Sequence, residues 1–290
     1  MQVELIGGLT EDTTIWRYMS IDKFINLLED SGLFFSPLSF YKKTDPFEGY
    51  PPAFVIKLMY SIGDKFYEDT QKNIKHLENL SVTQAGNPEF TDALIRFKSQ
   101  FAERPEKFRK TFTQLTKGIL VNCWYGGVCE SEAMWKLYGE SNKGVAIRST
   151  VGKLKAALET AEQLSWSNKM FIGKVKYLDY ADASLTPRDC MTGGHIAPLL
   201  KRNQFSHENE IRAFFVPNIS YETLDTFESE PYQMNMDISD LIEEVYVSPY
   251  VDVSYAKAVR AVFKRYGLQC QLNESDLLTG EEQLFDFLKV

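Results

Sequence analysis

Residues 206–215 read Ser-His-Glu-Asn-Glu-Ile-Arg-Ala-Phe-Phe, and this stretch is the strongest single fold signal in the chain. Alternate side chains of an extended chain share a face, so Glu208, Glu210 and Arg212 would form one row. Two carboxylates about 6–7 Å apart repel one another, and one should be easier to protonate. This pair suits acid–base chemistry or stabilisation of a cationic transition state. An ion ladder in which Arg212 merely neutralises Glu210 explains the pattern equally well.

Other strand-like segments occur in both halves of the chain, with amphipathic helical segments between them. The helical spacing of apolar residues after Ser20, and again from residues 131, 154 and 255, predicts short helices. This order predicts an α+β fold in a single domain, residues 1–290, with a mixed or antiparallel central sheet. The expected strands are residues 15–19, 33–36, 119–124, 144–148, 173–177, 210–216 and 244–247.

Residues 61–117 have a different character, because their pattern is helical and strongly charged. A turn-forming stretch at residues 84–88 divides the segment into two parts. Its apolar stripes are too thin for a core of their own, which favours a helical insertion over a separate domain. We therefore expect the stripes to lie on the main body.

The composition is typical of a globular protein, with 44% hydrophobic and 25% charged residues. A net charge of -8 argues against broad binding to nucleic acid. The first ten residues lack Lys and Arg, and no apolar run approaches the ~20 residues of a membrane helix, so neither a signal peptide nor a membrane span is expected. The four cysteines lack Cys-x-x-Cys spacing, which favours reduced thiols and a cytoplasmic location.

Two groups of residues are candidates for ligand binding. Arg17 lies between Trp16 and Tyr18, where a guanidinium could hold a phosphate and a ring could stack on a base. Trp135 and Tyr138 lie on adjoining faces of an expected helix and could form a pocket wall for a flat ring. The alternatives are an arginine paired with a nearby acid and ordinary core aromatics.

Asp45 and Glu48 flank a turn around Pro46. Together with Glu208 and Glu210 they could form a carboxylate site for Mg²⁺. The same residues would also serve as a turn former and a cap. No histidine has metal-ligand spacing to another, so a bound metal is not the leading expectation.

The ordered motifs of the chain resemble those of a bacterial family known as domain of unknown function 2971. The resemblance extends from about residue 15 to about residue 249, and departs from the family pattern at Thr44 and at Trp124-Tyr125. It implies a fold group and no established activity. The motifs are Trp16-Arg17-Tyr18, residues 33–36, Asp45-Pro46-Phe47-Glu48-Gly49, residues 132–139, residues 143–147 and residues 208–212.

A weaker resemblance, to ADP-ribosyltransferases, rests on the order of Arg17, then Tyr138 or Trp135, then Glu208 and Glu210. It implies an NAD-using transferase or glycohydrolase. Arg17, beside Tyr18, would hold the pyrophosphate or a ribose, and Tyr138 or Trp135 would pack on the nicotinamide. Glu210 would stabilise the oxocarbenium charge, and Glu208 would orient or deprotonate the acceptor, which is water or a macromolecule.

Two other readings remain open. The first is a Mg²⁺-dependent phosphodiesterase or nuclease using Asp45, Glu48 and the two later glutamates. The second is a non-catalytic sensor or partner-binding domain, in bacterial or phage defence, with the ion row as structural support. The NAD hypothesis requires Arg17 and Glu210, with Trp135 and Tyr138, to line one cleft. Asp45, Glu48 and Arg212 are expected as further residues of this pocket.

Overall fold

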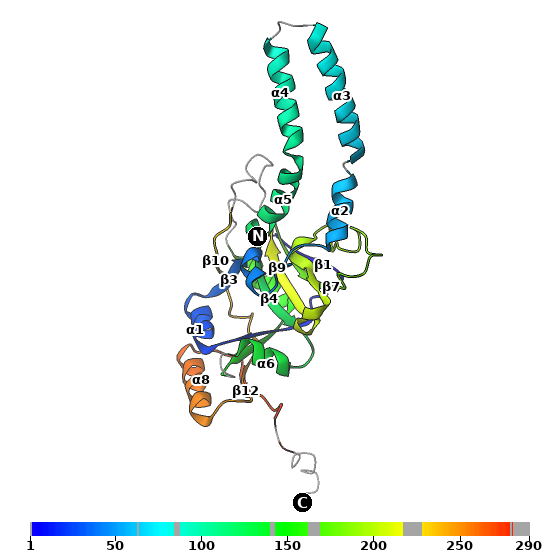
Figure 1. Cartoon of the computed structure of the whole chain (residues 1–290). Helices are drawn as coiled ribbons and strands as arrows, with labels where there is room; N and C mark the ends of the chain where they lie inside the picture. Colours follow the sequence, from blue (N-terminus) through cyan, green and yellow to red (C-terminus); the bar gives the residue numbers. More distant parts are fainter. Residues whose placement is uncertain are drawn as a thin grey trace, which may run out of the picture.

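The computed structural model describes residues 2–62, 64–83, 88–139, 143–161, 169–216, 228–278 and 280. Within these residues a ten-stranded mixed sheet forms the body of the molecule, and a two-stranded sheet accompanies it (Figure 1). The main path through the large sheet is β1-β6-β9-β4-β2-β5-β11-β12. The strands are β1 (Gln2–Ile6), β2 (Thr14–Met19), β3 (Gly32–Pro37), β4 (Leu120–Gly126), β5 (Val145–Thr150), β6 (Lys169–Lys174), β7 (Lys176–Leu178), β8 (Leu200–Arg202), β9 (Glu210–Phe215), β10 (Tyr232–Asn235), β11 (Glu244–Val247) and β12 (Gln271–Glu274).

The predicted α+β class and mixed sheet are confirmed. In the large sheet β1 pairs with β6, and β11 with β12, in parallel, while the other pairs are antiparallel. Helices α1 (Ile21–Glu29), α7 (Val151–Thr160) and α8 (Val253–Arg265) pack their apolar faces into one buried cluster with β2, β5, β9 and β11. Helix α6 (Glu132–Tyr138) packs on the opposite face of β2, against Trp16 and Tyr18.

The helical insertion begins earlier than predicted and is arranged differently. It comprises α2 (Ala53–Ile62), α3 (Asp64–Thr83), α4 (Pro88–Ala102) and α5 (Arg104–Gly118). Helices α3 and α4 run side by side and project away from the sheet (Figure 1). The expectation that the apolar stripes lie on the main body is therefore wrong for these two helices, which contact each other instead. The inner part of α5 reaches the body, where Gln114, Thr116 and Gly118 are buried.

The segment 206–215 is only partly a strand. Residues Asn203–Glu208 form a 3-10 helix (η3), and Asn209 follows with a left-handed φ of 37°, a conformation that asparagine tolerates better than most residues. The Asn209 side chain donates a hydrogen bond to the carbonyl of Gly126 and so fixes this turn. Strand β9 begins at Glu210, so the expected row of Glu208, Glu210 and Arg212 is wrong for its first member.

The sheet splits beside β4. On one edge β4 pairs with β9 from Leu120 to Tyr125. On the other edge β2 reaches only Tyr125 and Gly126, and β3 reaches only Leu120 and Val121. Among the described residues no strand pairs with this edge at residues 122–124. Because β2 and β3 diverge there, a gap opens between them that side chains and a ligand can occupy.

Candidate functional site

A pocket of about 740 Å³ lies at the split. One face of α1, parts of β2 and β3, the middle of β4 and two residues of α6, Met134 and Tyr138, contribute to its wall. Arg17, Tyr18, Tyr138 and Glu210 all line this pocket, although they come from widely separated parts of the chain. Four of the residues proposed from sequence are therefore brought together.

Arg17 is the unsatisfied group of this pocket. Within the described part of the chain, its guanidinium has neither a hydrogen-bond partner nor a carboxylate partner, and Nη1 is fully buried. Its Cζ lies 5.7 Å from the centre of the Trp124 ring. Burial lowers the pKa of Arg17. A desolvated cation without a counter-ion is costly to keep, so the site fits an anionic ligand that would supply the missing partner.

The aromatic residues have different roles from one another. Tyr138 lines the pocket and remains 42% exposed. Burial and the nearby Glu208 and Glu210 raise its pKa, so its hydroxyl stays neutral. The hydroxyl of Tyr18 accepts a hydrogen bond from the Ser131 amide at 2.7 Å, which ties β2 to the start of α6.

The prediction that Trp135 forms part of the pocket wall is wrong, because Trp135 does not line the pocket. Its side chain is fully buried, and its ring lies edge-on against Tyr18 with 4.9 Å between ring centres. The indole nitrogen donates to Glu130 at 2.7 Å. Trp135 therefore supports Tyr18 from behind as a core residue.

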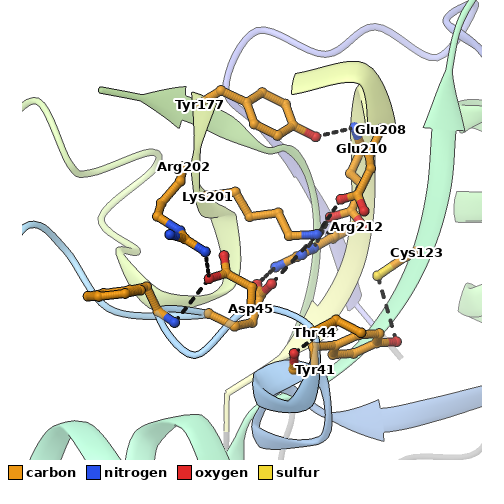
Figure 2. Close-up of polar contacts among 12 residues, drawn as sticks. Tyr41, Thr44, Asp45, Cys123, Tyr177, Lys201, Arg202, Glu208, Glu210 and Arg212 are labelled. Carbon is orange, nitrogen blue, oxygen red and sulfur yellow. Dashed lines mark hydrogen bonds and ion pairs between the residues drawn. The ribbon is translucent and has the colours of Figure 1, made fainter. Parts of the chain in front are cut away.

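Glu210 belongs both to the pocket and to a buried ion cluster, which Figure 2 shows with its side chains converging. Arg212 donates from Nε to Glu210 at 2.7 Å and from Nη1 to Glu48 at 2.8 Å. Lys201 hydrogen-bonds to Glu208, and its Nζ lies 3.5 Å from Glu210 Oε1 and 3.6 Å from Glu48 Oε2. Neither Glu48 nor Arg212 has any solvent-exposed side-chain surface.

This cluster contains three carboxylates and only two cations, so one negative charge is in excess. Burial, and then the charge of Glu210, raise the pKa of Glu208. Burial alone would also raise the pKa of Glu210, but Arg212 and Lys201 outweigh it and hold that pKa below its usual value. As the sequence suggested, one carboxylate is easier to protonate than the other. Glu210 is the one that stays ionised.

Glu208→Gln is expected to flatten the pH dependence of stability. Because folding raises the pKa of Glu208 from its ordinary value of 4.5, its contribution is fully present below pH 4.5 and is lost as pH rises through the folded value. Urea unfolding between pH 4 and pH 8 measures this loss in both proteins. The control is Glu4→Gln on β1, whose carboxylate pairs with Lys169 near the surface. An unaltered profile in Glu208→Gln would contradict the assignment.

Asp45 and Glu48 do not line the pocket, contrary to the prediction. Asp45 accepts a hydrogen bond from Arg202 at 2.6 Å and one from the Phe47 amide at 3.0 Å. With Glu48 bound to Arg212, the two acids fasten the loop at residues 44–49 to the sheet. Glu208 and Arg212 also lie outside the pocket wall. In the described ranges, no group of three or more His, Cys, Asp or Glu residues has an arrangement that could hold a metal ion.

Sequence reasoning missed Lys201 and Asn122. Lys201 follows the apolar run at residues 197–200, and a lysine at the end of such a run was the one available signal. Asn122 is buried on β4; its Nδ2 donates to the Phe34 carbonyl at 2.9 Å, and its Oδ1 accepts from the Trp124 indole at 2.7 Å. Asn122 thus braces the split and positions the ring beneath Arg17.

The molecule is thus an α+β protein whose split sheet borders a pocket that contains an ionised carboxylate and a cation without a partner among the described residues. The profile of a family described as a protein of unknown function (DUF2971) matches residues 134–213. This match supports the first family resemblance over a region that includes Tyr138 and Glu210 but not Arg17. No curated protein and no solved structure was found to be similar to the chain. None of the comparisons supports the resemblance to ADP-ribosyltransferases.

In the described part of the chain, no helix has the length and apolar character required to cross a bilayer.

Proposed function

We propose that the pocket binds a nucleotide and that its substrate is NAD, whose bond between nicotinamide and ribose is cleaved. The observation that carries the proposal is the guanidinium of Arg17, which has no partner in the described residues and lines the same pocket as the ionised Glu210. A pyrophosphate satisfies a guanidinium through paired N–H···O bonds. The ring of Tyr138, which lines the pocket and is 42% exposed, offers a flat surface for a ring of the ligand.

The chemistry follows from the charge state of Glu210. When the glycosidic bond breaks, its electron pair leaves with nicotinamide, which departs as a neutral molecule and needs no acid. The ribose becomes an oxocarbenium ion, and an ionised carboxylate stabilises that charge. Water or a macromolecular hydroxyl or amine then attacks the anomeric carbon and releases its proton to solvent. The low pKa of Glu210 suits this electrostatic role.

Glu208 has a different part in this proposal from the one suggested by sequence. It lies outside the pocket wall and reaches Glu210 through Lys201. It is therefore a positioning residue that adjusts the charge felt at Glu210. The Mg²⁺-dependent alternative has no support in the geometry, because Asp45, Glu48 and the two later glutamates all bind cationic side chains.

Arg17→Met is expected to weaken binding of ADP-ribose by roughly 10- to 100-fold, since hydrogen bonds between charged groups are lost. Stability should stay equal or rise, because the variant removes an unpaired buried cation from the folded protein. Calorimetric titration measures the first effect and thermal unfolding the second. The control is Lys169→Met, which removes a surface cation far along the sheet on β6.

Two results would count against the proposal. Equal affinity of Arg17→Met and the parent protein for ADP-ribose would show that Arg17 does not hold the ligand. Tight binding of NAD without release of nicotinamide would favour the non-catalytic sensor, which uses the same pocket without turnover.

A further inference from the structure

The edge of β4 that faces the pocket exposes one residue's backbone hydrogen-bonding groups. In an antiparallel sheet, the N–H and C=O of successive residues point to opposite edges. The Gly126 amide donates to Asn209, which directs the even-numbered residues of β4 toward β9. The Leu38 amide donates to the Ile119 carbonyl, which directs the odd-numbered residues toward β3 and β2. Cys123 is odd-numbered, so its N–H and C=O point into the split.

The neighbouring odd-numbered residues are paired, and Cys123 is not. Tyr125 is opposite Trp16 on β2, and Val121 is opposite Ser36 on β3. Within the described ranges no strand residue is opposite Cys123 on this edge. Continued registers would bring Tyr18 or Phe34 opposite it, but β2 and β3 have diverged by that point. A donor and an acceptor on one residue therefore face the pocket, to which Cys123 contributes its wall.

The groups beside Cys123 are already engaged and hold the gap open. The Phe34 carbonyl, which would point at β4 from β3, accepts the hydrogen bond of Asn122 Nδ2 at 2.9 Å. Asn122 in turn is buried, with 1% of its surface exposed. The Asn122 side chain thus satisfies the Phe34 carbonyl, which would otherwise accept a hydrogen bond from the β4 backbone. Neither of its two hydrogen bonds goes to the Cys123 peptide.

We infer that the pocket recognises its ligand by an amide edge, in which a carbonyl accepts from the Cys123 N–H while an adjacent N–H donates to the Cys123 C=O. This inference rests on the proposed function in one respect, namely that the ligand occupies this pocket. Unpaired buried backbone groups cost free energy until a partner satisfies them, so the edge selects ligands that carry both groups.

Two kinds of small molecule carry a carbonyl and an adjacent N–H in this arrangement. A primary carboxamide on a pyridine ring, as in nicotinamide, offers a carbonyl and an N–H on one carbon. The lactam edge of uracil or hypoxanthine offers the same pair within its ring. A peptide strand is disfavoured, because strand addition needs several consecutive free residues and β4 offers only Cys123 here.

Selective labelling tests the inference at the atom concerned. The chain has four cysteines, so protein labelled with ¹⁵N-cysteine gives at most four backbone amide signals, and Cys123→Ala identifies one of them. The ligands are nicotinamide, uridine and 3-acetylpyridine, which keeps the carbonyl but lacks the N–H. At saturation, nicotinamide or uridine is expected to slow hydrogen exchange of the Cys123 amide at least about tenfold. The exposed Cys129 is the internal control and should not change.

Affinities complete the test. 3-Acetylpyridine should bind on the order of tenfold more weakly than nicotinamide, because it leaves the Cys123 carbonyl unpaired. The inference is overturned if 3-acetylpyridine binds as tightly as nicotinamide, if a bound amide leaves Cys123 exchange unaltered, or if neither nicotinamide nor uridine binds.

The same data separate this inference from the proposed function. Protection of Cys123 by uridine and not by nicotinamide would uphold the amide edge and end the NAD proposal. Cleavage of NAD without protection of Cys123 would uphold the NAD proposal and end the amide edge.

Discussion

Glu210→Gln is expected to lower the rate of NAD cleavage by a factor on the order of 10² or more, while NAD still binds. The reason is electrostatic: the amide cannot stabilise a developing cation as the carboxylate does, and Arg17, which would hold the pyrophosphate, is unchanged. The measurement is release of nicotinamide under single-turnover conditions, with binding followed separately by calorimetry. Unchanged turnover would remove Glu210 from the mechanism.

The control must separate lost chemistry from lost structure. Glu210→Gln takes one negative charge out of a cluster that has one in excess, so Arg212 keeps Glu48 and Lys201 keeps Glu208 as partners. The variant is therefore expected to fold. Glu4→Gln is a matched control, since this glutamate also lies on a strand and also pairs with a lysine, but near the surface. A reduced rate in both variants would point to a general defect.

Arg212→Met is expected to cause the largest loss of stability, about 3–5 kcal/mol. Arg212 is fully buried between Glu48 and Glu210, and it also donates to the Pro198 carbonyl at 3.0 Å. Removing it leaves two buried carboxylates with Lys201 as their one remaining cation in the cluster. Urea unfolding measures the effect as a shift of the midpoint.

A second substitution identifies the cause of that loss. Adding Glu48→Gln to Arg212→Met removes one of the stranded charges and should recover part of the lost stability. The control is Arg260→Met on α8. Arg260 forms an exposed ion pair with Glu274 on β12, so its loss should leave the urea midpoint almost unchanged. No recovery in the double variant would mean that packing, and not charge, explains the effect of Arg212.

The fold was predictable wherever local pattern and tertiary structure agree. Alternating and fully apolar runs identified most strands of the large sheet, and helical spacing identified α1, α6, α7 and α8. The alternation of residue types wrongly placed Glu208 in a strand, because a short 3-10 turn that ends in a left-handed asparagine has no distinctive pattern of apolar residues. Pattern failed also for α3 and α4, because thin apolar stripes fit a helix pair as well as a helix lying on a body.

The site was predictable only in part, for a physical reason. Arg17, Tyr138 and Glu210 carry distinctive chemistry in the sequence, and the sheet order brings them to one pocket. The role of Cys123 depends on its backbone and on the point where two strands diverge, which no residue type reveals. Lys201 was missed because Glu48 comes from a distant loop, and because Glu208 and Glu210, although near in the sequence, reach it only through the turn of η3.

The projecting helices have a consequence for how the chain can vary. With 20 and 15 residues, α3 and α4 extend about 30 and 22 Å at the usual rise per residue. Since they pack chiefly on each other, whole turns could be gained or lost in step on both helices, and only the outer tip would move. The length of this helix pair can therefore change while the sheet and its pocket keep their shape.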